Sequence, residues 1–254
     1  MMSALELLES HRYADAITAC QRQLSIDPDD MAAQGTLAAA YRALGRYEEA
    51  LPLYQRVGAH ERARKAAPGH PGRQKDISCI YWMLGDKAKS IHLMRALVEG
   101  ILDGTIQYGD AAGGVEQGLL LYYMAVTMRD PEAASFALDY MRNRSRRSAI
   151  QLWPGPVARY YLGEVDFPTV LNAATGAADI ENATSIARSK LLSRRRLCGA
   201  LFHDGVRARA QGEEQHFLAR MRNCYQLENP LIEVEWYLAR HEVEQAEKLG
   251  SARI

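Results

Sequence analysis

The sequence predicts an all-α protein, built as a solenoid of helical hairpins. Hydrophobic residues recur at three- and four-residue spacing along the chain, and no segment shows the sustained alternation that is typical of strands. Tyr13 and Tyr47 lie 34 residues apart, as do Ala16 and Ala50. A constant period of this length within amphipathic segments indicates a repeated helix-turn-helix unit. Because one hairpin cannot bury its own apolar face, we expect the hairpins to stack.

The second copy of the repeat has the clearest pattern. Its characteristic residues are Leu37, Ala38, Tyr41, Leu44, Gly45, Tyr47, Ala50 and Tyr54. Small Ala38 and Ala50 allow two helices to approach closely, and Gly45 suits the left-handed residue that ends a helix. This order and spacing resembles the tetratricopeptide repeat. The resemblance implies a right-handed superhelical α-solenoid, and the 254 residues leave room for about six to seven hairpins with a C-terminal capping helix.

The repeats are expected in the N-terminal part of the chain. The predicted repeats cover residues 1–30, 31–64, 71–104 and 115–148. Residues 105–114 read TIQYGDAAGG, which is too rich in glycine and turn residues for a helix and predicts a loop. Residues 149–254 are predicted to form irregular hairpins. The last hairpin turns at Gly212, and a capping helix begins at Asn229-Pro230.

The C-terminal half also resembles bacterial tetratricopeptide proteins of the NlpI type. The segments that carry this resemblance are Trp153-Pro154-Gly155-Pro156, Tyr160-Tyr161-Leu162-Gly163, Leu197 to His203, Gly212-Glu213 and Glu235 to Arg240. The resemblance implies that these segments form the last repeats and a capping helix. It also implies that the protein acts as an adaptor.

Composition limits the classes of partner. The chain has 31 lysines and arginines and 31 acidic residues, so no global field attracts nucleic acid or a membrane surface. The N-terminal residues show no signal-peptide pattern and no apolar run spans a bilayer, so we expect a cytoplasmic protein without membrane insertion. The four cysteines lack metal-binding or CxxC spacing, which favours buried free thiols.

The tetratricopeptide resemblance also implies which residues line a concave groove. In the second repeat they are Ala32, Gly35, Ala39, Arg42 and Ala43; in the third, Gly72, Lys75, Cys79, Trp82 and Met83; in the fourth, Glu116, Leu119, Tyr123, Val126 and Thr127. The predicted partner-binding set is Arg42, Lys75, Cys79, Trp82, Glu116, Leu119 and Tyr123. Trp82 and Tyr123 are the expected aromatic anchors, because aromatic side chains contribute most to interface energies. The alternative is that Trp82 packs on the neighbouring hairpin.

Two clusters of arginines form a possible basic patch. They are Arg142, Arg144, Arg146 and Arg147, and Arg194, Arg195 and Arg196. Such clusters can contact nucleic-acid phosphates, but no aromatic residues are interleaved with them as single-strand binding requires. Acidic residues between Glu228 and Glu247 are an alternative set of partners for these arginines.

No pattern of catalytic, phosphate-binding or metal-binding residues is present, so the sequence predicts no enzymatic activity, cofactor or metal. The predicted function is that of an adaptor that binds a partner protein in its concave groove. Irregular repeats and small size also resemble bacterial immunity proteins, which would neutralise a toxin or effector domain. A nucleic-acid binder that uses the arginine clusters is the second alternative.

Overall fold

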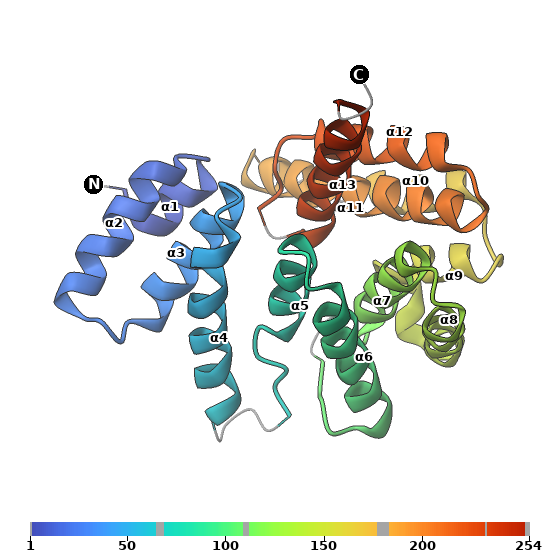
Figure 1. Ribbon diagram of the computed structural model, residues 1–254, viewed down its shortest axis with the longest axis horizontal. Helices are drawn as coiled ribbons and strands as arrows, with labels where there is room; N and C mark the ends of the chain where they lie inside the picture. The colour runs from blue at the N-terminus through green and yellow to red at the C-terminus, as the bar shows by residue number, and fades with distance from the viewer. Residues whose placement is uncertain (1, 65–68, 109–111, 177–182, 232, 252–254) are drawn as a thin grey trace. The chain divides into compact units, whose positions relative to one another are not determined.

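The computed structural model describes residues 2–64, 69–108, 112–176, 183–231 and 233–251. In these residues there are thirteen α-helices, one short 3-10 helix and no strand (Figure 1). The predicted all-α class of helical hairpins is therefore confirmed. The chain divides into two compact units, residues 1–108 and residues 109–254, so the expected fourth repeat lies in the second unit.

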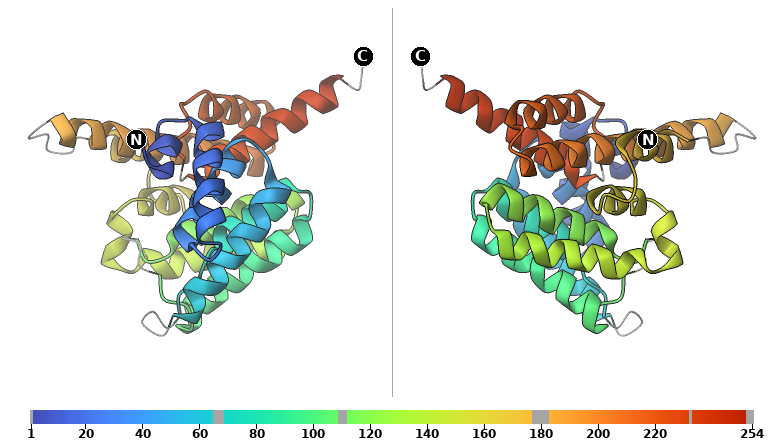
Figure 2. Two further views of the ribbon diagram at one scale, coloured as in Figure 1. Left: turned by 90° about the vertical axis from the view of Figure 1, so that its left-hand side faces the viewer. Right: turned by 90° about the vertical axis from the view of Figure 1, so that its right-hand side faces the viewer.

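Unit 1 contains three helical hairpins. Its helices are α1 (Ala4–Glu9), α2 (Tyr13–Ile26), α3 (Met31–Ala43), α4 (Tyr47–Ala63), α5 (Gln74–Met83) and α6 (Lys87–Asp103). The helices pair as α1–α2, α3–α4 and α5–α6, and α2 packs on α3 as α4 packs on α5 (Figure 1; Figure 2, left). The hairpins therefore stack in chain order.

The 34-residue period corresponds to equivalent positions in the first two hairpins. Helix α2 begins at Tyr13 and α4 begins at Tyr47. Ala16 and Ala50 are both fully buried, as close helix approach requires. Gly45 has a φ of 77°, in the left-handed region that the predicted cap needs.

The third hairpin replaces the two small alanines by hydrogen-bonded serines. Ser78 and Ser90, forty positions beyond Ala38 and Ala50, are fully buried between α5 and α6. The Ser78 hydroxyl donates to the Ser90 carbonyl at 2.8 Å, and the Ser90 hydroxyl donates to the Ser78 carbonyl at 2.7 Å. Each buried hydroxyl therefore has the partner that it needs.

Gly72 does not lie on the first helix of the third repeat, so that predicted groove position is wrong. Helix α5 begins two residues later, at Gln74. Gly72 has a φ of 60°, and a Cβ atom there would lie 2.7 Å from the carbonyl oxygen of Gly58. The glycine instead allows the connection to pass close to α4.

Unit 2 is less regular. Its helices are α7 (Val115–Met128), α8 (Pro131–Ser145), the 3-10 helix η1 (Ser148–Gln151), α9 (Gly155–Tyr161), α10 (Phe167–Thr175), α11 (Ala183–Ala210), α12 (Glu214–Tyr225) and α13 (Val234–Ser251). Helices α7 and α8 form one hairpin (Figure 2, right), and α11 and α12 form another. Helix α11 also packs on α7 and α10, and α13 packs on α11 and α12.

Two of the predicted connections in the C-terminal part of the chain agree with the structure, and the start of the capping helix differs. The expected loop at residues 105–114 is irregular on both sides of residues 109–111, which lie outside the described part. Gly212 turns the last hairpin with a φ of 82°. The capping helix begins at Val234 rather than at Asn229, because Leu231 has a φ of 66° that interrupts a helical path.

The four cysteines are free and buried, as predicted. Among the described helices, none combines the length and the apolar character that crossing a bilayer requires.

Candidate functional site

Arg42 joins two hairpins of unit 1. Its side chain is buried, and Nη1 donates a hydrogen bond of 2.5 Å to Oδ1 of Asp76 on α5. The guanidinium also lies 5.5 Å from the ring centre of Tyr54 on α4. Arg42 was predicted to face a partner in the groove, whereas in this structure its charge is used to hold α3 against α5.

The α5 residues of the predicted groove are mostly enclosed. The side chains of Cys79 and Trp82 are buried, with Trp82 fully so, and Lys75 is half-buried. Lys87 Nζ lies 5.0 Å from the centre of the Trp82 ring, within the range of a cation–π contact. Trp82 is therefore not the exposed anchor that the sequence predicted, and the packing alternative describes it better.

Helix α3 keeps an accessible face of small residues. Ala32 is exposed, and Gly35 and Ala39 are half-exposed. A Cβ atom added at Gly35 would have no heavy atom of the described part of the chain within 4 Å. This face, which we call the α3 small face, occupies predicted groove positions and leaves room above the helix.

The corresponding face of α7 in unit 2 is covered by the protein itself. Leu119 and Tyr123 are fully buried. The Tyr123 hydroxyl donates a hydrogen bond of 2.6 Å to Glu242 of α13. The centre of the Tyr123 ring lies 4.9 Å from that of Phe202 of α11, in an edge-to-face arrangement. A binding role that needs an exposed Tyr123 or Leu119 is contradicted, because α11 and α13 fill that side of α7.

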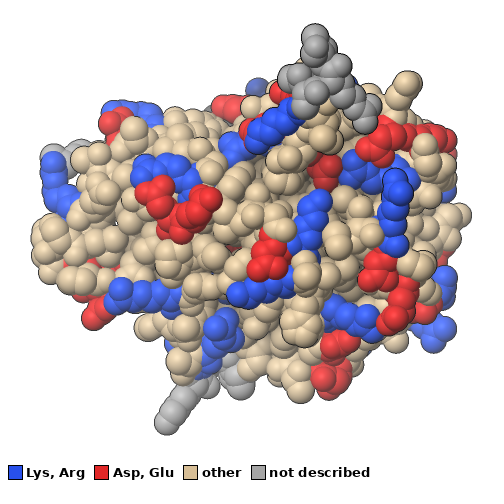
Figure 3. All heavy atoms as spheres, in the orientation of Figure 1, with Lys and Arg blue, Asp and Glu red and all other residues tan. Residues whose placement is uncertain are grey.

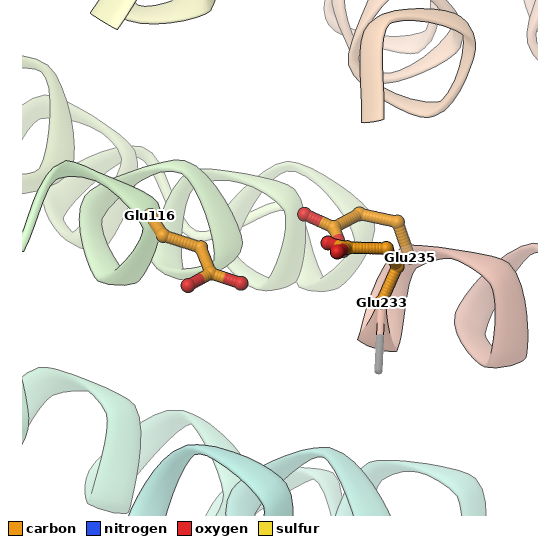
Figure 4. Close-up of side chains that lie close together, drawn as sticks. All are labelled: Glu116, Glu233 and Glu235. Atoms are coloured by element: carbon orange, nitrogen blue, oxygen red, sulfur yellow. The ribbon is translucent and has the colours of Figure 1, made fainter. Parts of the chain in front are cut away.

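Glu116 of α7, also in the predicted partner-binding set, belongs to a group of three carboxylates. The other members are Glu233 and Glu235, at the start of α13, and one carboxylate oxygen of each residue lies within 4.8 Å of the other two. Figure 4 shows the side chain of Glu116 reaching toward Glu233 and Glu235. Arg195 Nε lies 3.8 Å from Glu233. His203 Nε2 of α11 lies 3.5 Å from Glu235. These residues could hold a cation, although the sequence predicted no metal.

An open polar cleft of about 690 Å³ lies beside α9 and α11. Its lining residues are Tyr160, Gly163, Glu164, Val165, Asp166, Phe167, Thr169, Arg207 and Gln211. The Tyr160 hydroxyl donates to Asp204 at 2.6 Å, and burial together with this hydrogen bond raises the pKa of Tyr160 to about 12. The phenol therefore stays protonated near neutral pH and can donate a hydrogen bond but cannot act as a base.

The first arginine cluster does not form one basic surface. Arg142 is exposed and paired with Asp139, whereas Arg144 is buried with its guanidinium 5.2 Å from the ring centre of Tyr140. Arg146 and Arg147 are exposed. These four neighbours in sequence therefore do not act together.

The second arginine cluster meets the expected acidic residues. Arg194 pairs with Glu228, and Arg195 lies near Glu233, while Arg196 is half-buried. The predicted C-terminal counter-charges are confirmed for two of the three arginines. On the face shown in Figure 3, basic and acidic side chains are interspersed.

Comparison with known proteins supports the prediction of tetratricopeptide repeats in unit 1. Residues 7–67, which cover α2, α3 and α4, match the tetratricopeptide repeat family model. This match supports the predicted tetratricopeptide repeats within that segment of unit 1. No curated protein matches the chain. Among solved structures, the chain is similar to a tetratricopeptide repeat protein from Parabacteroides merdae, with 12% sequence identity, a TM-score of 0.45, and coverage of 94% of this chain and 95% of that chain.

The sequence predicted the repeat pattern of unit 1, but it did not predict that Glu116 lies with Glu233, Glu235 and His203 in unit 2. Tyr161, His203 and Glu235 appear in the sequence pattern only within the segments that carry the NlpI-type resemblance, and Glu233 only among the acidic residues near the arginines. Their assembly depends on how α11 and α13 pack on α7, which no spacing within the chain encodes. The local signal in the sequence was an acidic pair two positions apart, Glu233 and Glu235, on either side of the first residue of α13.

Proposed function

We propose that this chain is a non-catalytic adaptor that binds a partner protein through its tetratricopeptide repeats. Stacked hairpins of this kind expose an extended surface made of successive helices. The observation that supports the proposal most directly is the α3 small face in the matched segment. An apolar helix or an extended segment of a partner fits a surface of this kind, because small side chains permit close backbone approach.

Gly35 is the most informative position on this face. Glycine within a helix costs about 0.5 to 1 kcal/mol relative to alanine. A Cβ atom added at this position would meet no heavy atom of the described residues within 4 Å. A larger residue at position 35 therefore has room for its Cβ atom in the free protein. The same residue would occupy the volume that a docked partner needs.

The test compares three substitutions in the full chain. Gly35→Trp should abolish partner capture from a lysate of the native host, whereas Gly35→Ala should leave it unchanged. Ala96→Trp, at an exposed position of α6, adds the same bulk on the second helix of a hairpin. Mass spectrometry would quantify the captured proteins, and circular dichroism would verify the helical content of each variant. Equal capture by Gly35→Trp and Ala96→Trp would contradict the proposed face.

The identity of the captured protein separates the adaptor from an immunity protein. An adaptor should retain envelope or cell-wall proteins, as the NlpI-type resemblance of residues 149–254 predicts. If a toxin or effector domain is the dominant captured protein, the function is neutralisation of that protein and not the adaptor role. Cell fractionation of the host tests the cytoplasmic location that belongs to this proposal.

Nucleic-acid binding is not favoured by the arginine geometry. Arg194 and Arg195 already face acidic residues, so phosphate contacts would have to displace these partners. We expect the purified protein to carry no nucleic acid at moderate salt. We also expect neutralisation of Arg194, Arg195 and Arg196 to change the association rate and its salt dependence more than the affinity for a protein partner. Absorbance spectra measure any nucleic acid that the protein retains, and binding kinetics measure the association rate, its salt dependence and the affinity.

A further inference from the structure

The carboxylate group in unit 2 has a buried imidazole directed into it. His203 of α11 is 1% exposed, and its Nε2 atom has no hydrogen-bond partner among the residues that the structure describes. The distance from Nε2 to Glu235 Oε1 is 3.5 Å, which is too long for a hydrogen bond of ordinary strength. Glu235 is itself buried, and its carboxylate lies with those of Glu116 and Glu233.

The other nitrogen of this imidazole is already engaged. His203 Nδ1 and the Tyr161 hydroxyl are 2.8 Å apart. When Nδ1 carries the proton and donates a hydrogen bond to the Tyr161 hydroxyl, Nε2 presents a lone pair toward the carboxylate oxygens. Two electron-rich groups facing each other in a buried site repel unless a cation or a proton lies between them. A histidine that ligates a metal commonly has its second nitrogen fixed in this way.

We propose that Glu116, Glu233, Glu235 and His203 form a binding site for a divalent transition-metal ion. Three carboxylates alone would suit calcium or magnesium, which take oxygen ligands. The imidazole shifts the preference toward ions that accept both oxygen and nitrogen, such as Mn²⁺ and Zn²⁺. Arg195, near Glu233, offsets part of the negative charge and so reduces the repulsion among the three carboxylates.

The bound ion would connect three elements of unit 2. Glu116 lies in the first turn of α7, His203 lies within α11, and Glu235 lies in the first turn of α13. Metal binding to the folded state alone stabilises that state by mass action. The site therefore acts as a structural crosslink within unit 2, whereas the adaptor face on α3 belongs to unit 1.

Titration of the metal-depleted full chain with Mn²⁺ alone, followed by electron paramagnetic resonance of the free ion, tests the site. The expected result is saturable binding of a single equivalent, with a higher melting temperature and little competition from Mg²⁺. Glu235→Gln and Glu116→Gln should each weaken binding by at least about tenfold. Tyr161→Phe, which removes only the group that orients His203, should weaken it about 10- to 100-fold. Glu244→Gln, an exposed position of α13, is the matched control and should bind as the unmodified chain does.

A spectroscopic measurement on the unmodified protein tests the site without depending on whether the variants fold. In the unmodified protein, diamagnetic Zn²⁺ should shift the Nε2 nitrogen resonance of His203, and Mn²⁺ should broaden it. The rival arrangement is a His203 whose Nε2 carries a proton directed at Glu235. A His203 signal that neither ion changes would overturn the metal site, and so would equal binding by the Glu235→Gln and Glu244→Gln variants.

Discussion

Tyr123 and Glu242 are joined by a hydrogen bond of 2.6 Å although 119 positions separate them in the chain. Glu242 also accepts a hydrogen bond of 3.1 Å from Arg209. The Tyr123 hydroxyl, placed by the sequence pattern on a partner-binding surface, therefore belongs to a network that links α7 to α11 and α13. A buried network of this kind stabilises one arrangement of the three helices.

Replacing Tyr123 by phenylalanine should destabilise unit 2 by about 1 to 3 kcal/mol, because a part-buried carboxylate loses one of its donors. Urea denaturation followed by circular dichroism measures this change. Tyr225→Phe removes an exposed hydroxyl from α12 and should have little effect. Equal midpoints for the two variants would show that the Tyr123 bond contributes nothing to stability.

Ala50 is the small residue on which the packing of the second repeat depends. It is fully buried, so Ala50→Phe forces extra volume between helices and should cost about 1 to 3 kcal/mol. Glu48→Ala, at an exposed position two residues earlier, should cost little. Melting temperatures provide the comparison, and an equal shift for both substitutions would mean that the repeat register is wrong.

Two helical glycines should respond in opposite directions to the same substitution. At Gly35 a new methyl group meets open space, so Gly35→Ala should stabilise the protein by about 0.5 to 1 kcal/mol. At Gly118 the new Cβ would lie 2.5 Å from Tyr140 Cδ1, so Gly118→Ala should be destabilising. Denaturant midpoints measure both changes. A gain in stability from both substitutions would contradict the close packing of α7 on α8.

The buried thiols should react slowly in the native protein. Burial raises the pKa of Cys20 to about 11 and that of Cys198 well above its usual value. Because the thiolate is the reactive form, little of it is present near neutral pH, and the fraction grows only as pH rises toward the raised pKa. A colorimetric thiol assay should detect slow reaction in the native state and rapid reaction of all four cysteines in denaturant. Rapid native labelling of Cys198 would contradict its enclosure beside Cys224, whose Sγ atom is 3.0 Å away.

The candidate sites differ in how far the sequence could predict them. The α3 small face follows from its place in a repeat, since Ala32, Gly35 and Ala39 recur at helical spacing on one side. Trp82 also follows the repeat pattern, yet its exposure could not be predicted. A pattern identifies which side of a helix a residue occupies, whereas its accessibility depends on the elements that pack against that side.

The sequence by itself determined the all-α class, the 34-residue period, the left-handed turn at Gly45 and the small contact at Ala50. These features depend on local backbone preferences and on the contact between adjacent helices of one hairpin, which short-range spacing encodes. Only the tertiary structure decided that Tyr123 is enclosed and that His203 meets Glu235. Both depend on α11 and α13 returning to α7 across long stretches of chain, and such contacts arise from the burial of apolar faces that many sequences share.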